Sequence, residues 1–308
     1  MSLRRQLLLV SLLLLSLPWA GCQFIREMEG ALRTGQVQSL QATAEAVASV
    51  LSSQQPLLYP NPERRGAPQD KRRSVYAWPT SQQIILDGYD DGWEDVEGIH
   101  FESDTGQELA VSIKAQTRQG NLYLLLNVND PEVVYHNPGL SREPNGDRLV
   151  LRLWRQGRRQ DYIVATAAPG NVRGRWGNRR ERGLDANRIR GNWQDAIGGY
   201  SLELEIPLDY TGGRLGFYLI NAKFRSGGTK ESLGNIEPLD TAAPPWLIYH
   251  PLALHQLLTP FNRRGNSIQV VDQHNWVLAD LPPSLSESQS DGETFWLLRL
   301  IYRLSLIH

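Results

Sequence analysis

The spacing of apolar residues divides the chain into an N-terminal helical part and a longer part made of short strands. Residues 7–17 are mostly apolar. Over residues 26–51, apolar residues recur in steps of three and four, which is the spacing of an amphipathic helix. Residues 54–73 contain four prolines and a basic run, a composition typical of a linker. We therefore expect a stalk helix over residues 26–55 and a linker over residues 56–74.

Beyond residue 74 the pattern changes to short apolar runs separated by Gly, Pro, Asn and Asp. The segment YSLELEIP alternates apolar and acidic residues, which predicts a strand with one buried and one solvated face. RQGRRQ predicts a hairpin turn between two strands. The expected strands cover residues 121–128, 147–154, 161–167, 200–207 and 214–221. Short strands at this spacing, without helical periods between them, predict a mainly β fold with a β-sandwich over residues 75–225.

The end of the chain is expected to contain a connecting region and a helix. Residues 226–290 connect the sandwich to the C-terminus and include a predicted β-hairpin at residues 268–279. Residues 291–308 are apolar apart from two arginines one helical turn apart. They show no helix-stopping signal, so we expect a C-terminal helix that is cut short where the chain ends.

The first 25 residues are predicted to form an uncleaved signal anchor. Two arginines precede an apolar stretch that approaches the roughly 20 residues a helix needs to cross a bilayer. The bias of basic residues toward the cytoplasm places the N-terminus inside the cell. The residues expected in the bilayer are Leu7, Leu17, Trp19 and Ile25, with Trp19 near the outer interface.

The sequence leaves two other fates of this segment open, acylation at Cys22 and cleavage by signal peptidase. Lipoproteins usually have Leu, Val or Ile three places before the acylated cysteine, where this chain has Trp19. Cleavage after Ala20 or Gly21 would put Pro18 or Trp19 at a position that prefers small residues. The uncleaved anchor is therefore the favoured interpretation.

The apolar stripe of the stalk helix has the spacing of a short parallel coiled coil. It predicts a homodimer formed through this helix. An equally favoured alternative is that the stripe packs on the sandwich of its own chain, because two heptads are too few to be diagnostic. The stripe consists of Val37, Leu40, Ala44, Val47 and Leu51.

Composition and charge exclude several classes of function. Lys and Arg total 32 and Asp and Glu total 33, so the chain has no positive field to attract nucleic acid. The single cysteine rules out an internal disulfide, and the six histidines show no metal-ligand spacing. No phosphate-binding loop, dinucleotide fingerprint or nucleophile elbow occurs in the sequence. We predict no catalytic residue, no metal site and no cofactor in this chain.

An aromatic and arginine-rich loop at residues 170–193 supplies the candidate ligand-binding residues. Flat aromatic rings stack on the apolar faces of sugar rings, and guanidinium groups bind anions in pairs. The favoured alternative is a mobile surface insertion whose tryptophans pack in the core or at its rim. The candidates are Trp176, Trp193, Arg173, Arg175, Arg179 and Arg180, and the expected ligand is a glycan or an envelope polymer.

Two acidic features are interpreted as structural. Residues 87–95 carry five carboxylates, but they lack the DxDxDG spacing of a calcium loop and match ordinary turn chemistry. Glu203 and Glu205 have the appearance of a glycosidase pair. They alternate with Leu and Ile, so we expect them on the solvated face of one strand.

The order of motifs over residues 84–221 resembles a family 9 carbohydrate-binding module. The matching segments are ILDGYDDGWEDV, LYLLLNVND, NGDRLVLRL, GYSLELEIP and RLGFYLIN. The resemblance covers about 140 residues, under half of the chain. It implies a β-sandwich that binds sugar, but the sugar-contacting aromatic residues of that family have no counterpart here that a motif identifies.

The arrangement of the whole chain resembles the input region of the sensor histidine kinase of the proteobacterial dedicated sortase system. That resemblance implies a periplasmic β domain on the bacterial inner membrane, which senses a ligand and signals through a two-component system. The response regulator, ATP and Mg would belong to a kinase core that is absent from this chain, since no phosphoacceptor or ATP-lid box occurs. The alternative function is a stand-alone carbohydrate-binding protein, either membrane-anchored or a lipoprotein.

Overall fold

The computed structural model describes most of the chain, which divides into two compact units, Met1–Gln55 and Pro56–His308. Each unit is described by itself. The described residues are 3–59, 61–64, 70–103, 109–177, 184–224, 228–262 and 266–283. The C-terminal helix expected at residues 291–308 lies outside them.

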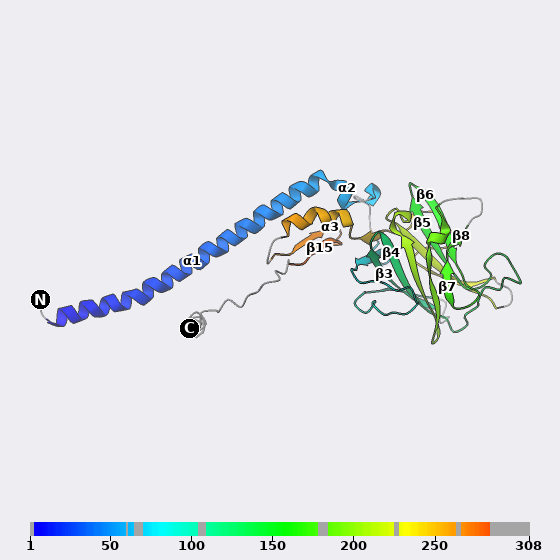
Figure 1. Cartoon of the computed structure of the whole chain (residues 1–308), viewed down its shortest axis with the longest axis horizontal. Coiled ribbons are helices and arrows are strands. Elements are labelled where there is room, and N and C mark those ends of the chain that lie inside the picture. The colour runs from blue at the N-terminus through cyan, green and yellow to red at the C-terminus, as the bar shows by residue number, and fades with distance from the viewer. Residues whose placement is uncertain are drawn as a thin grey trace. The chain divides into compact units, whose positions relative to one another are not determined.

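The N-terminal unit is one continuous helix, α1 (Leu3–Ser53), so the predicted anchor and stalk belong to a single helix (Figure 1). The side chains of Leu7 and Leu17 lie outside the described residues, whereas those of Trp19 and Ile25 are exposed. Within the described part of the chain, no helix is long and apolar enough to cross a membrane. The uncleaved signal anchor over residues 1–25 stays a prediction.

The stalk part of α1 has the polar pairing expected of an exposed helix. Arg33 forms an ion pair with Glu29 one turn earlier, with 2.7 Å between Nη2 and Oε1. Such pairs stabilise a helix only slightly, by about 0.2–0.5 kcal/mol. Val37 and Leu40 of the predicted stripe are exposed. Dimerisation through this helix stays a prediction.

The described part of the second unit contains two large β-sheets and a separate two-stranded one. The larger is built from β1 (Val75–Pro79), β2 (Ile99–Glu102), β3 (Ala110–Arg118), β4 (Asn121–Asn129), β7 (Gly170–Arg173), β9 (Arg190–Ala196), β10 (Gly199–Pro207) and β13 (Leu247–Tyr249). The smaller is built from β5 (Arg148–Arg155), β6 (Arg158–Val164), β8 (Arg175–Trp176), β11 (Leu215–Ala222) and β12 (Thr229–Gly234). All five strands predicted from the sequence are present, as β4, β5, β6, β10 and β11.

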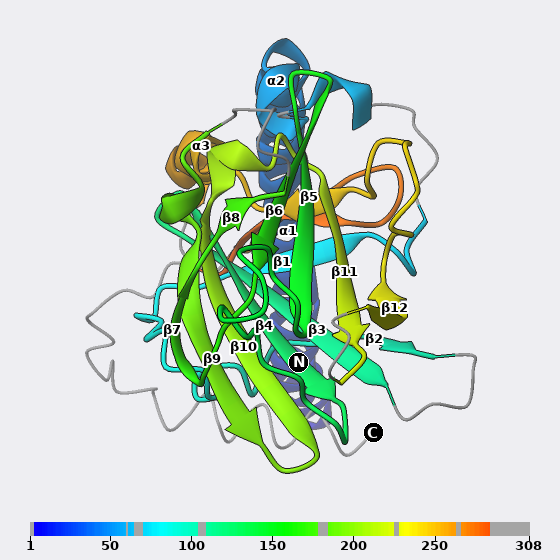
Figure 2. The same cartoon turned by 90° about the vertical axis from the view of Figure 1, so that its right-hand side faces the viewer.

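The order of strands shows how each sheet is assembled, and Figure 2 labels strands of both. The larger sheet runs β13-β1-β3-β4-β10-β9-β7, with β2 also paired to β3, and the smaller runs β12-β11-β5-β6-β8. Strand β1 is parallel to both of its neighbours. The hairpin turn predicted between β5 and β6 falls on Gln156 and Gly157, which both have positive φ, as a type I′ turn requires.

The main core lies between the two sheets, which therefore form the predicted β-sandwich. Alternate residues of the central strands point into it, because side chains in a strand alternate between its faces. The core includes Leu122, Leu124 and Leu126 of β4, Leu202, Leu204 and Ile206 of β10, Leu149 and Leu151 of β5, and Leu215 and Phe217 of β11.

The outer face of the larger sheet is covered, contrary to the prediction of a solvated acidic face. The loop between β1 and β2 places Trp93 against Tyr123 and Leu125, which point outward from β4. Beneath this cover Glu203 is only 1% exposed, and Glu205 is buried too. The prediction was wrong because alternation assigns a side chain to a face but does not say whether another segment covers that face.

Glu203 is stabilised in this position by three hydrogen bonds from the covering loop. Its Oε2 accepts the backbone N–H groups of Asp87 and Gly88, and its Oε1 accepts Nε1–H of Trp93, all at 3.1 Å. Burial raises the pKa of Glu203, and the three donors oppose that shift. The acidic turn at residues 87–95 thus has a structural role, since its N–H groups bind the carboxylate of Glu203. Among the described residues no cluster of His, Cys, Asp and Glu could hold a metal ion.

Short elements surround the sandwich. They are α2 (Gln55–Leu58) and η1 (Pro62–Arg64), then η2 (Ala186–Arg188), η3 (Leu208–Tyr210), α3 (Leu252–Leu258) and η4 (Thr259–Phe261). The last described strands, β14 (Ile268–Val271) and β15 (Val277–Leu281), form an antiparallel hairpin where the sequence predicted one. This hairpin forms one wall of the site described next.

Candidate functional site

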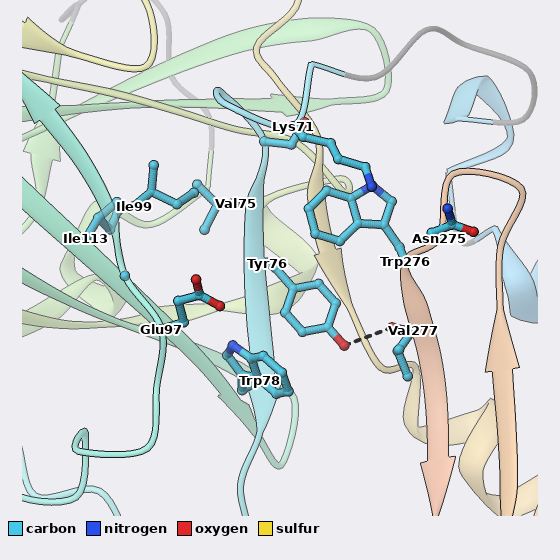
Figure 3. A pocket seen from close by; sticks show the side chains of 12 residues that line it. Lys71, Val75, Tyr76, Trp78, Glu97, Ile99, Ile113, Asn275, Trp276 and Val277 are labelled. Atoms are coloured by element: carbon cyan, nitrogen blue, oxygen red, sulfur yellow. Dashed lines mark hydrogen bonds between the residues drawn. The ribbon is translucent and has the colours of Figure 1, made fainter.

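An open pocket of about 350 Å³ lies between β1 and the hairpin β14–β15 (Figure 3). Strand β1 pairs with β3 only through Trp78 and Pro79, and the pocket lies where the earlier residues of β1 are separated from β3. Its volume falls within the range of about 300–1,000 Å³ that is usual for small-ligand sites. The residues that give it chemical character are Lys71, Tyr76, Trp78, Glu97, Asn275 and Trp276.

Strand β1 directs two aromatic rings to the pocket. Val75 and Ala77 are buried in the core, so the side chains of Tyr76 and Trp78 point the other way. The Trp78 ring meets the Tyr76 ring edge to face, with 4.9 Å between centroids and 77° between planes. Trp78 is 42% exposed, which leaves much of its indole surface accessible to a ligand.

The third aromatic ring comes from the opposite wall, on the turn between β14 and β15. Trp276 stacks on Tyr76, with ring centroids 5.5 Å apart and planes only 10° apart. The ammonium of Lys71 lies 5.4 Å from the centre of the Trp276 ring, within the range of a cation–π contact. Figure 3 shows the Tyr76 ring between Trp78 and Trp276, with Glu97 on the side away from Trp276.

The hydroxyl of Tyr76 links the two walls beneath the rings. It donates to the carbonyl oxygen of Val277 at 2.9 Å and lies 2.7 Å from Nε2 of His250. Because a phenol has one proton, Nε2–H of His250 donates to the phenol oxygen. Burial, helped by the charge of Asp280, raises the pKa of Tyr76 to about 12, and burial lowers the pKa of His250. Both groups are therefore neutral near pH 7.

Two polar atoms at the pocket are buried without a hydrogen-bond partner among the described residues. They are Oγ of Ser74 and Nε1 of Trp276. Buried polar groups in native proteins nearly always have a partner, and an unpaired one costs about 1–3 kcal/mol. The exposed side chains of Lys71 and Glu97 add one positive and one negative charge. The pocket thus combines aromatic surface with a few polar groups able to bind hydroxyls.

The tryptophans predicted to bind a ligand lie elsewhere and do not form a pair. Trp193, on β9, is buried in the core, where its ring stacks on Tyr200 at 4.0 Å between centroids. Neither face is free for a sugar, so the alternative of core packing describes Trp193. Trp176, on β8, is half-buried and packs on Tyr162 with centroids 5.1 Å apart.

The predicted arginines are placed only in part. Arg173 and Arg175 are exposed, and Arg179 and Arg180 lie outside the described residues. Arg175 and Trp176 line a smaller hollow of about 290 Å³ together with Arg142 and Asn187. A ligand role for this loop stays a prediction.

The patterns in the sequence did not identify the aromatic residues of the pocket beside β1 as ligand-binding candidates. A signal for Tyr76 and Trp78 existed in VYAWP, where small apolar residues alternate with aromatic ones. No local signal could have paired them with Trp276, which lies about 200 residues later. Only the folded hairpin brings these rings together.

Comparisons with known proteins give a limited result. No protein family and no curated protein sequence matches the chain. Among solved structures, a carbohydrate binding module family 9 from Caldicellulosiruptor kristjanssonii in complex with cellotriose aligns at 18% identity and a TM-score of 0.45. The alignment covers 57% of this chain and 93% of that one. The same module in complex with glucose aligns at 18% identity and a TM-score of 0.42, over 57% and 96% of the two chains.

The fold of this chain is therefore described by its own geometry. That geometry is a long N-terminal helix followed by a mainly β unit built as a sandwich. None of these findings supports the predicted histidine kinase or sortase-system membership, which stays a prediction.

Proposed function

We propose that the second unit is a carbohydrate-binding module whose ligand lies in the pocket of Tyr76, Trp78 and Trp276. The observation that carries the proposal is an accessible indole beside a stacked aromatic pair, with the exposed charged groups of Lys71 and Glu97 at the same place. The apolar face of a pyranose ring packs well on an indole, and its hydroxyls would hydrogen-bond to the ammonium of Lys71 and the carboxylate of Glu97.

The charges around the pocket favour a neutral sugar over the anionic polymer considered from the sequence. Lys71 and Glu97 contribute opposite charges, so the pocket has no net positive field. A polyanion would be repelled by Glu97, whereas hydroxyl groups can accept from the ammonium and donate to the carboxylate. A neutral glycan is therefore the ligand class that we propose.

A direct binding experiment tests the proposal. A glycan array probed with the full chain would identify ligands, and calorimetry with cellotriose and glucose would start from the sugars of the two aligned structures. W78A should weaken binding of the selected sugar about 10- to 100-fold, the effect of losing about 1.4–2.7 kcal/mol. The matched control is W176A, which removes a half-buried indole from the other hollow.

The two variants also separate this site from the one predicted from the sequence. Binding that survives W78A and W276A but is lost in W176A would move the ligand to the arginine-rich loop. Absence of binding across a broad glycan array would remove the carbohydrate proposal altogether.

The exposed apolar side chains of α1 favour a second proposal, that this helix pairs with a copy of itself. Burying Val37 and Leu40 against a second helix would remove apolar surface from water. In a C22S background, cysteines at residues 37 and 40 should crosslink more than a cysteine at the polar position 38. Equal crosslinking at all three positions would contradict pairing through the stripe.

A further inference from the structure

The short segment η1 is attached on two sides within the second unit. Asn61, just before it, donates from Nδ2 to a backbone carbonyl of the turn preceding β11, at 2.8 Å. Glu63 forms an ion pair with Arg214 beside the same turn, at 3.3 Å. On its other side, Nη2 of Arg64 lies 2.6 Å from Oδ2 of Asp272 in the C-terminal hairpin. The segment therefore joins the sandwich to the hairpin that carries one wall of the pocket.

The ion pair between Arg64 and Asp272 is deeply buried. Arg64 is 4% exposed and Asp272 is 7% exposed. Water does not screen a pair in such a site, and removal of one partner leaves a buried charge without compensation. The pair therefore constrains the position of the hairpin more firmly than an exposed surface pair would.

The carboxylate of Asp272 also organises the turn that holds Trp276. Its Oδ1 accepts the backbone N–H groups of His274 at 2.8 Å and Trp276 at 3.0 Å. The backbone N–H of Asp272 in turn donates to the carbonyl of Trp276 at 2.9 Å. Asn275 adopts a positive φ of 62°, a conformation that requires local support in a residue other than glycine. One oxygen of Asp272 thus binds the turn while the other binds Arg64.

We infer that Arg64 is a positioning residue for the aromatic pocket. By holding the Asp272 carboxylate, it fixes the turn and with it the place of the Trp276 ring against Tyr76. The inference about the turn is independent of any ligand, and its consequence for affinity rests on the proposed sugar binding. The coupling is reciprocal. If the contact between Arg64 and Asp272 increases the affinity for a ligand at Trp276 by some factor, binding of that ligand stabilises the contact by the same factor.

Through these contacts, a ligand bound in the pocket can affect the segment at the start of the second unit. Along the chain, η1 is the next element after α2. A ligand that stabilises the turn would therefore also stabilise the segment through which the chain enters the sandwich. The coupling is a shift in the population of one ordered arrangement and requires no chemical step.

The first test follows amide hydrogen exchange over residues 272–276 of the full chain without ligand. R64M should accelerate this exchange at least tenfold, and R64K should restore part of the protection because it keeps the charge. The matched control is R190M, which removes a pair of similar length, 2.7 Å, between the exposed Arg190 of β9 and the buried Glu205, away from the hairpin. Unchanged protection in R64M would overturn the inference.

A second variant covers the case in which R64M fails to fold. R64M/D272N removes both buried charges, while the asparagine oxygen can still accept the two N–H groups of the turn. If Arg64 positions the turn through Oδ2, this double variant should fold, as thermal unfolding would show, and should exchange faster than the unaltered chain but no faster than D272N, whose amide NH₂ already faces the guanidinium. Protection in the double variant equal to that of the unaltered chain would show that Arg64 is dispensable.

Calorimetry with cellotriose, or with the sugar selected on the array, separates the inference from the proposed function. Faster exchange in R64M together with at least fivefold weaker binding supports both. Faster exchange in a protein that binds no sugar supports the positioning role and contradicts the proposed function. Unchanged exchange with unchanged affinity leaves the sugar-binding proposal standing and contradicts the role of Arg64.

Discussion

Two aromatic clusters are built on the larger sheet, and they differ in whether they are complete. In the first, Trp93 is fully buried over Tyr123 and Leu125, and its indole N–H donates to Glu203. In the second, Trp78 is 42% exposed, and the indole N–H of Trp276 has no partner in the described part of the chain. The first cluster is closed and satisfied, whereas the second is open and unsatisfied.

This difference indicates which cluster serves the fold and which is available for binding. A closed cluster with every polar group paired gains its stability within the chain and offers a ligand no surface. An open cluster leaves apolar area and hydrogen-bonding capacity unused, which a ligand can take up. The count of tryptophans in the sequence did not distinguish the two clusters, but the exposure of their rings does, at 0% for Trp93 and 42% for Trp78.

The largest expected effect comes from removing the closed ring. W93A should lower the free energy of unfolding by about 3–5 kcal/mol, since it deletes a fully buried aromatic side chain and frees Glu203 of one donor. Urea denaturation measures the change, with W78A as the control. A loss no greater than that of W78A would contradict the structural role of the cluster.

A smaller loss of stability is expected when a substitution keeps the shape of the Trp93 cluster but disrupts its hydrogen bonds. E203Q should lower the free energy of unfolding by about 2–3 kcal/mol, because an amide NH₂ group would face backbone or indole donors. Sugar affinity should be unchanged, since Glu203 does not line the pocket. Denaturation and calorimetry measure the two quantities. A less stable protein with unchanged sugar affinity would show that the Trp93 cluster serves stability and not binding.

The pH dependence of stability should have opposite signs in the two clusters. Glu203 has a raised pKa in the folded state, so its contribution is full below about pH 4.5 and declines as the pH rises through the folded pKa. His250, beneath the open cluster, has a lowered pKa, so its contribution is full above about pH 6.5 and declines as the pH falls through the folded pKa.

The two contributions can be separated by difference. The free energy of unfolding, measured from pH 4 to pH 8, should show both slopes in the unaltered chain, while E203Q and H250Q should each lose one of them. H250Q should lose the decline in stability that the unaltered chain shows as the pH falls, and E203Q should lose the decline that it shows as the pH rises through the folded pKa of Glu203. Parallel curves for all three proteins would contradict the assigned shifts.

The smallest effect on stability is expected at the open cluster. W78A should change the free energy of unfolding by at most about 1 kcal/mol, because much of the ring is already in water. Its effect on sugar affinity should exceed its effect on stability. A W78A protein as unstable as W93A would mean that Trp78 is a structural residue and would remove the contrast between the clusters.

Several elements of the fold could be predicted from local sequence because their causes are local. The alternation in YSLELEIP and the turn at Gln156 and Gly157 depend on neighbours in the chain. The same alternation placed Glu203 on the correct side of its strand but gave the wrong environment. A loop more than 100 residues earlier in the sequence covers that side.

The candidate site shows the same limit more strongly. The sequence predicted stacking tryptophans within one loop, yet Trp193 turned inward because its strand lies against the core. Tyr76 lies on β1, which pairs in parallel with β13, and Trp276 lies on the hairpin β14–β15. The two rings stack only because the fold brings these elements together. Side chains that converge from separate elements leave no spacing rule along the chain.

The sequence by itself determined the long N-terminal helix, the mainly β character of the rest and the positions of the central strands, because backbone preferences and apolar periodicity act over a few residues. Only the tertiary structure decided which tryptophans are buried, which carboxylates are covered and where a ligand can enter. Those outcomes depend on contacts between residues far apart in the chain, such as Arg64 with Asp272, and burial is a property of the assembled sheets and not of any one segment.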